Sequence, residues 1–205
     1  MPIRKLHYTS GVIIMVFVGL HLFNHVWSVF GIDRHIEMMN ALRLFYRKIF
    51  VEMVLLGAIL VQITSGLKLF KANRKTATGN FDKLQVWTGL YLAIFFFIHV
   101  GAVLVGRLYL NLDTNFYFGV AGLNTFPFLL FFIPYYGFAI LSFFGHIASI
   151  HSKKMQQDIL GLSPKRQATT ILAFGILCTV LIFYGLTDHF RGVIVPKEYE
   201  VLIGK

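Results

Sequence analysis

His21 and His99 lie inside apolar stretches, where an ionisable side chain needs a specific partner. His99 lies within residues 84–106, LQVWTGLYLAIFFFIHVGAVLVG, a run without charge that is long enough to cross a bilayer. His21 lies within an earlier apolar run, residues 10–30. From the helical rise, the two lie about 18 Å (His21) and about 22 Å (His99) from the same side of the membrane. Because an imidazole at this depth is costly unless it pairs, hydrogen-bonds or ligates, we expect the two to act together.

A pair of imidazoles at matching depth on two helices suits a flat, apolar ligand with a central metal, and haem b fits this description. We therefore expect His21 and His99 to be the axial ligands of one haem iron. Small side chains would leave room for the porphyrin, and we expect Thr88, Ala102 and Gly106 to do so beside His99.

Two other interpretations of these histidines stay open. His21 and His25 share one helix face and could bind zinc or copper, although the sequence places no carboxylate or thiolate ligand near them. If His21 is not the haem ligand, we expect its neighbour His25, one turn along, to take that role. In the second interpretation, each histidine only hydrogen-bonds a nearby backbone group or serine.

A second polar level is expected nearer the N-terminal side. Gln62 and His146 lie about 12 Å and about 8 Å from that side, again from the helical rise. A glutamine in mid-membrane needs a partner. We expect Gln62 to hydrogen-bond His146 or a small polar ligand such as a quinone headgroup.

The composition predicts the elements that carry these residues. Of the 205 residues, 57% are hydrophobic and only 14% are charged, which is typical of an integral membrane protein. We predict one all-α domain, residues 1–205, built as a bundle of five transmembrane helices. A short amphipathic helix should follow the first span, within residues 31–49, and lie at the membrane interface. The predicted spans are residues 10–30, 50–70, 84–106, 126–151 and 168–189.

The net charge of +10 indicates topology rather than nucleic-acid binding, because the Lys and Arg residues lie between the apolar runs. Five spans place the two termini on opposite sides. Eleven of the nineteen basic residues lie on the N-terminal side, so we expect a cytoplasmic N-terminus in the cytoplasmic membrane. These eleven are Arg4, Lys5, Lys68, Lys71, Arg74, Lys75, Lys83, Lys153, Lys154, Lys165 and Arg166.

The sequence contains no glycine-rich nucleotide loop and no nucleophile constellation, and its single cysteine, Cys178, excludes a disulfide framework. We therefore expect no catalytic residues. Any flavin or iron–sulfur centre would belong to partner chains.

Several segments in order along the chain carry a resemblance to a known family. They are RKLHYTSGV in the first span, Glu52 with the Gln62–Gly66 spacing in the second, LQVWTG and IHV around His99, SFFGH at His146, and SPKRQ at residues 163–167. In these features the chain resembles the five-helix cytochrome b membrane subunit of succinate dehydrogenase and fumarate reductase, the type with two haems on one polypeptide. The resemblance covers all five spans.

The resemblance implies specific roles. In that family one haem is held by the first and third spans, and a second, nearer the catalytic subunits, by the second and fourth. His99 matches the third-span ligand, His21 matches the first-span ligand after a shift of one residue, and His146 matches the fourth-span ligand. Gln62 occupies the place of the second-span ligand, so one haem in the outer half is expected.

The function implied by the resemblance is electron transfer. Such a subunit anchors flavoprotein and iron–sulfur subunits on the cytoplasmic side and passes electrons between them and membrane quinone. The alternative is a haem-free protein of the same fold that acts as a transporter or an assembly component.

Overall fold

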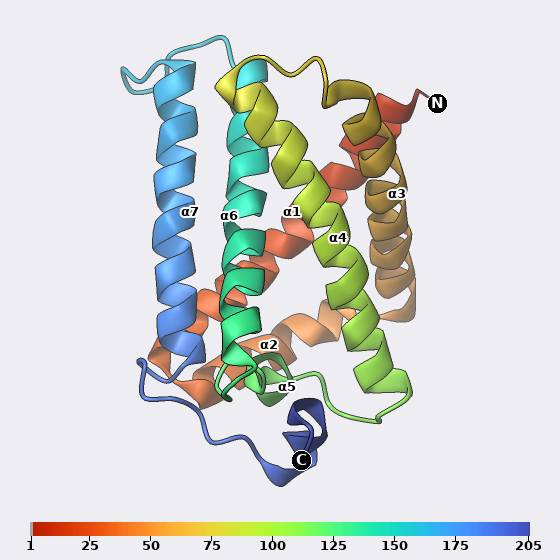
Figure 1. The fold of residues 1–205 in the computed structure, drawn as a ribbon, viewed down its shortest axis with the longest axis vertical. Helices are drawn as coiled ribbons and strands as arrows, with labels where there is room; N and C mark the ends of the chain where they lie inside the picture. Colours follow the sequence, from red (N-terminus) through yellow and green to blue (C-terminus); the bar gives the residue numbers. More distant parts are fainter. Residues whose placement is uncertain (1) are drawn as a thin grey trace.

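The computed structural model describes residues 2–205, which form seven α-helices and two short 3₁₀ helices and contain no β-strand (Figure 1). The helices in chain order are α1 (Ile3–Trp27), η1 (Ser28–Phe30), α2 (Ile32–Tyr46), α3 (Ile49–Asn73), α4 (Asn80–Leu108), α5 (Phe116–Val120), α6 (Leu129–Lys154), α7 (Pro164–Leu186) and η2 (Lys197–Ile203). The all-α prediction is confirmed.

Five of these helices are long and apolar enough to cross a membrane: α1 with η1, α3, α4, α6 and α7. They form a ring in which α1 packs against α3 and α7, α3 against α4, α4 against α6, and α6 against α7. The N-terminus lies at one end of the bundle and the C-terminus at the other, as an odd number of spans requires (Figure 1). The chain is therefore a multi-pass membrane protein with the predicted five-span architecture.

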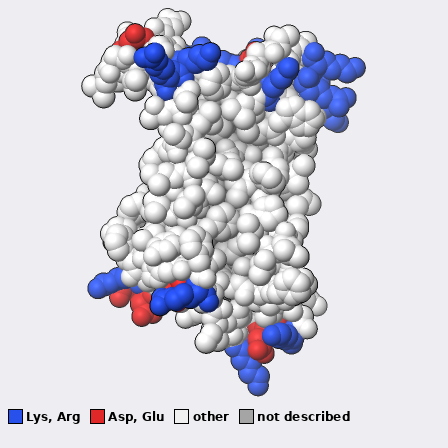
Figure 2. Space-filling view, turned by 60° about the vertical axis from the view of Figure 1, so that its left-hand side comes forward, with Lys and Arg blue, Asp and Glu red and all other residues white. Residues whose placement is uncertain are grey.

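Charged side chains lie at the two ends of the bundle, and the belt between them is uncharged on the face seen in Figure 2. Basic residues dominate the N-terminal end, whereas basic and acidic residues mix at the C-terminal end. This distribution follows from the cost of placing charge in hydrocarbon. Most of the helices are longer than the predicted apolar spans. The reason is that a helix can continue past the apolar span into the polar interface until a turn residue ends it.

The fourth span starts later than predicted. It was expected from residue 126, but α6 begins at Leu129. Pro127 accounts for the difference, because a proline disfavours the helical conformation of the residue before it, here Phe126. Pro134, in contrast, lies inside the second turn of α6, where packing absorbs its missing N–H.

The C-terminal end of the bundle is closed by short elements. The predicted interfacial helix is α2, whose buried side chains are His35 and Met39, one turn apart on the same face. Helix α5 adds Phe116 and Val120 to a buried cluster with Ile182 and Leu186 of α7. Ion pairs tie these elements down: Arg107 of α4 to Glu52 of α3, and Arg43 of α2 to Asp113 at 2.9 Å.

The contact between α7 and η1 gives a test of this packing. A Cβ atom on Gly185 would lie 2.7 Å from the backbone of Ser28 and of Val29, and backbone atoms cannot turn away. We expect Gly185→Ala to lower the free energy of unfolding by about 1–3 kcal/mol through overpacking. Thermal unfolding of the purified protein in detergent measures this loss.

Gly57→Ala is the matched control, because a Cβ there meets no atom within 4 Å. This variant should unfold at the wild-type temperature or slightly above it. Equal melting temperatures for Gly185→Ala and wild type would contradict the close approach of α7 to η1.

Candidate functional site

The structure brings His21 of α1 and His99 of α4 together in the interior of the bundle. Their ring centroids lie 6.2 Å apart and their ring planes cross at 62°. Both helices pack against α3, which fixes their separation. Each residue is partly exposed when the chain is taken by itself.

His99 has no hydrogen-bond partner on either ring nitrogen in the part of the chain that the structure describes, and neither nitrogen is fully enclosed. Its neighbours are aromatic instead: Phe95 stacks on it at 4.9 Å, and Tyr136 meets it edge-on at 6.3 Å. The interpretation in which each histidine only bonds a backbone group or serine therefore does not describe His99.

The separation of the two rings would let them hold one metal-containing group between them. Imidazole nitrogens bind iron, zinc and copper, and a haem iron held by two histidines is one such group. His21 and His99, with ring centroids 6.2 Å apart, are therefore the residues that would hold it.

His25 and His35 extend the site toward the C-terminal end. His25 Nε2 lies 3.1 Å from His21 Nε2, and His25 Nδ1 lies 3.3 Å from His35 Nε2. Asn24 Nδ2 also reaches His35 Nε2, at 3.1 Å. The result is a hydrogen-bonded row of imidazoles that leads from α2 to the interior.

His35 was not among the predicted site residues. The sequence offered one signal for it, because His35 and Met39 are one turn apart and would both face inward from an amphipathic helix. Burial, followed by the nearby His21 and Arg43, lowers the pKa of His35 to about 4. The residue is therefore neutral at pH 7 and only 2% exposed.

No group of three or more His, Cys, Asp or Glu side chains converges to hold a metal ion in residues 2–205. The four histidines at the site are His21, His25, His35 and His99. Their lone pairs do not converge on one point, because His25 contacts His21 and His35 through opposite ring nitrogens. A zinc or copper ion at His21 and His25 would therefore lack a third protein ligand of these kinds.

The expected room beside His99 is not where the sequence placed it. Gly106 packs closely against the ring of Phe118, Ala102 is exposed on the outside of the bundle, and Thr88 lies near His146. The reason is distance along the helix, since Thr88 and Gly106 share the side of α4 that carries His99 but lie eleven and seven residues from it, about 16 Å and about 10 Å along the axis.

Gln62 and His146 lie at a separate site near the N-terminal end. Both line one small cavity of about 40 Å³. The expected hydrogen bond between them is absent from the described residues, because Gln62 Nε2 donates to the His7 carbonyl and to Ser10 Oγ. One enclosed water molecule needs about 10–15 Å³ of such space, so this cavity holds a few waters and is too small for a quinone headgroup as it stands.

His7 is the second residue that the sequence reasoning missed. It lies in the first turns of α1, and it lines the same cavity as Gln62 and His146. Its position beside the basic Arg4 and Lys5 gave the appearance of an interfacial residue, and only the packing of α1 on α3 places it inside the bundle.

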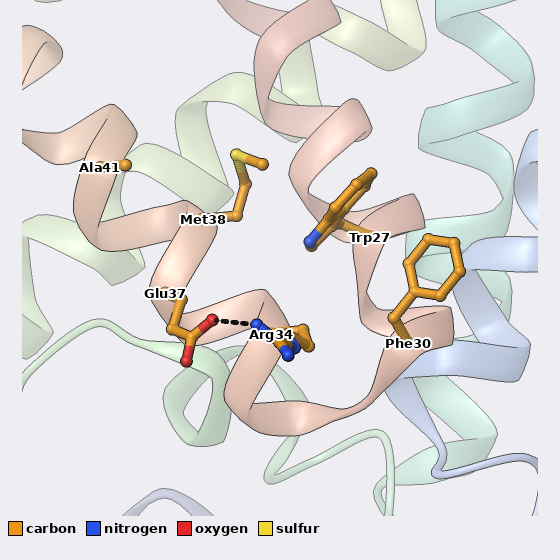
Figure 3. A pocket seen from close by; sticks show the side chains of 6 residues that line it. All are labelled: Trp27, Phe30, Arg34, Glu37, Met38 and Ala41. Carbon is orange, nitrogen blue, oxygen red and sulfur yellow. Dashed lines mark hydrogen bonds and ion pairs between the residues drawn. The ribbon is translucent and has the colours of Figure 1, made fainter.

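A larger hollow of about 510 Å³ lies at the junction of α1, η1 and α2, and no histidine lines it (Figure 3). Its rim carries an exposed ion pair of Arg34 and Glu37 at 3.1 Å. Its lining is otherwise apolar and offers no further chemistry: Trp27, Phe30, Met38 and Ala41.

Comparisons with models of protein families, with curated proteins and with solved structures found no match to this chain. The site therefore has to be interpreted from its own geometry.

The buried, neutral His35 predicts a pH dependence of stability. Its pKa is about 4 in the folded protein and 6.5 when exposed, so the unfolded chain binds the proton more tightly. Protonation of His35 therefore favours the unfolded chain. The free energy of unfolding does not depend on His35 above pH 6.5, and it falls by about 3 kcal/mol in total as the pH drops from 6.5 toward 4.

We expect His35→Gln to lose less stability than wild type between pH 7 and pH 5, measured as the shift in melting temperature. His151→Gln, at the other end of the bundle, is the control and should keep the wild-type dependence. Identical shifts in wild type and His35→Gln would show that His35 does not titrate as the structure implies.

Proposed function

We propose that this chain is the membrane-embedded b-type cytochrome subunit of a quinone-linked oxidoreductase, with His21 and His99 as the axial ligands of one haem. The observation that carries the proposal is the pair itself: two imidazoles from α1 and α4 with centroids 6.2 Å apart, of which His99 has no other partner among the described residues. An intramembrane imidazole in this condition is best explained as a ligand.

The surrounding residues support an apolar, planar cofactor. Phe17 stacks on His21 at 5.9 Å and Phe95 stacks on His99 at 4.9 Å, so both rings are oriented by aromatic neighbours. Haem would supply one-electron transfer at this position. The chain's own part is to hold the two imidazoles, exclude water and keep them neutral in a low-dielectric interior.

His25 has a positioning role in this proposal. Because the amide Nδ2 of Asn24 can only donate to His35 Nε2, His25 Nδ1 donates to that same nitrogen and His25 Nε2 accepts from His21 Nε2. His21 would then offer the lone pair of its Nδ1 to the haem iron while its Nε2–H stays on His25, as is usual for histidines that ligate metals.

The charge distribution supports the orientation and the partners. The N-terminal end carries eleven basic residues and only two acidic ones, Asp82 and Asp158. By the positive-inside rule we place this end in the cytoplasm, in the cytoplasmic membrane of the cell. Soluble flavoprotein and iron–sulfur subunits would dock there and exchange electrons with membrane quinone through the haem.

One observation favours a second candidate, a haem-free transporter. The row His35–His25–His21 is hydrogen-bonded ring to ring, as in the imidazole chains of proton-moving membrane proteins. The two functions are separated by haem content.

Haem stoichiometry tests the proposal. We expect about one haem per chain in the purified protein, and at least tenfold less in His99→Ala and in His21→Ala, because each removes an axial ligand and leaves the other imidazole unpaired. Pyridine haemochrome absorption against protein concentration measures this ratio. His151→Ala, outside the site, is the control.

Two outcomes would contradict the assignment of the ligands. Full haem occupancy in His99→Ala would exclude that residue. Loss of haem in His25→Ala but not in His21→Ala would move the ligand one turn along α1. His146→Ala should leave the ratio unchanged, and two haems per chain would place a second cofactor at the cavity of Gln62 and His146.

The orientation has its own test. Reporter tags at the two termini should lie on opposite sides of the membrane, with the N-terminal tag in the cytoplasm, because the spans are odd in number and the basic residues gather at that end. One reporter that fluoresces only in the cytoplasm and one that is active only in the periplasm, fused in turn to each terminus, identify the side on which that terminus lies. A periplasmic N-terminus would reverse the proposed docking side.

A further inference from the structure

The small cavity near the N-terminal end lies between four helices and has three polar residues on its wall. They are His7 of α1, Gln62 of α3 and His146 of α6, and the rest of the lining is apolar: Gly89, Leu92, Ala93 and Phe96. His7 lies fourteen residues before His21 on α1, which is about 21 Å along a helix. The cavity is therefore distinct from the proposed haem site.

The hydrogen bonds fix which nitrogen of His146 carries the proton. Its Nδ1 lies 3.1 Å from the carbonyl oxygen of Gln85, which can only accept. The other neighbour of Nδ1 is Thr88 Oγ1 at 3.3 Å, and that hydroxyl already donates to the Leu84 carbonyl. Neutral His146 therefore donates from Nδ1, and its Nε2 is left with a lone pair.

The same reasoning applies to His7. Its Nδ1 lies 2.8 Å from Ser65 Oγ, and Ser65 already donates its proton to the carbonyl oxygen of Val61. Nδ1 of His7 must be the donor, so Nε2 again keeps a lone pair. No hydrogen bond from the described residues reaches Nε2 of His7 or of His146.

Gln62 has its orientation fixed as well. Its Nε2 donates to the His7 carbonyl oxygen and to Ser10 Oγ, which itself donates to Leu6. The remaining Oε1 is an acceptor. The polar wall of the cavity thus presents lone pairs and, among the described lining residues, no donor.

Three glycines keep the space around these groups open. A Cβ on Gly89 would lie 3.2 Å from His146 Cε1, one on Gly66 would lie 3.6 Å from His7 Cε1, and one on Gly11 would lie 3.2 Å from Gln62 Nε2. The cavity of about 40 Å³ has room for an ion with a few water molecules, and excludes a porphyrin.

We propose that this cavity binds a single Cu(I) ion through Nε2 of His7 and Nε2 of His146, with Gln62 holding the His7 segment in place. Histidines that ligate metals typically donate their other ring N–H to a carbonyl or hydroxyl group, as both do here. Imidazole is a good ligand for copper. No carboxylate lines the cavity to compensate a divalent ion, so a monovalent ion is the least costly charge in this interior.

Competition titration tests the site. Full-length protein in detergent under reducing, anaerobic conditions is titrated with Cu(I) against a chromophoric Cu(I) chelator. We expect one tightly bound Cu(I) per chain and at least a hundredfold weaker binding in His7→Ala and in His146→Ala. Zn(II), titrated in the same way, should bind more weakly than Cu(I).

One control variant separates this site from the other histidines. His151→Ala, outside both histidine sites, should keep the wild-type copper affinity. Circular dichroism of all variants establishes that they fold, and Gln62→Leu should weaken copper binding without abolishing it.

Four outcomes would each overturn the proposal. They are copper binding unchanged in both His7→Ala and His146→Ala, binding lost in His151→Ala, tighter binding of Zn(II), and no tight copper binding at all, as expected for a cavity that holds only water.

Discussion

An unpartnered polar group in hydrocarbon costs roughly 2–7 kcal/mol, and this constraint governs the whole structure. Five spans satisfy their backbone groups within helices, and their charges gather at the two ends (Figure 2). Every polar side chain left inside must then find a neighbour. Thr88, Ser65 and Ser10 do so by donating to carbonyl oxygens one turn back on their own helices. A histidine cannot satisfy both ring nitrogens in this way. The histidines therefore indicate where the interior has polar atoms available for a ligand.

The imidazoles fall into two groups with different needs. At the N-terminal end His7 and His146 each have one nitrogen held by a protein acceptor and one lone pair left over. At the other level, His21, His25 and His35 pair with one another, and His99 faces His21 without a bond. Both arrangements leave lone pairs for a ligand, and in the second the rings of His21 and His99 lie 6.2 Å apart on different helices.

The spans, their order and the shared level of His21 and His99 could be predicted from the sequence, because hydropathy and helical rise determine them directly. Helix ends were less predictable, as the shift of the fourth span past Pro127 illustrates. His7 and His35 escaped prediction for a physical reason. Both lie where the chain looks interfacial, and only the packing of α1 on α3 and of α2 beneath the bundle turns them inward. Contacts between distant segments carry no local periodic signal, so the partner of Gln62 was also misjudged.

The central claim is that His21 and His99 hold a haem. A reduced-minus-oxidised difference spectrum of the purified protein tests it most directly, because a haem held by two imidazoles gives a b-type absorption change that no other group in this chain can produce. We expect a b-type spectrum in the wild-type protein and its absence in His99→Ala. A flat difference spectrum from folded protein expressed with ample haem would contradict it.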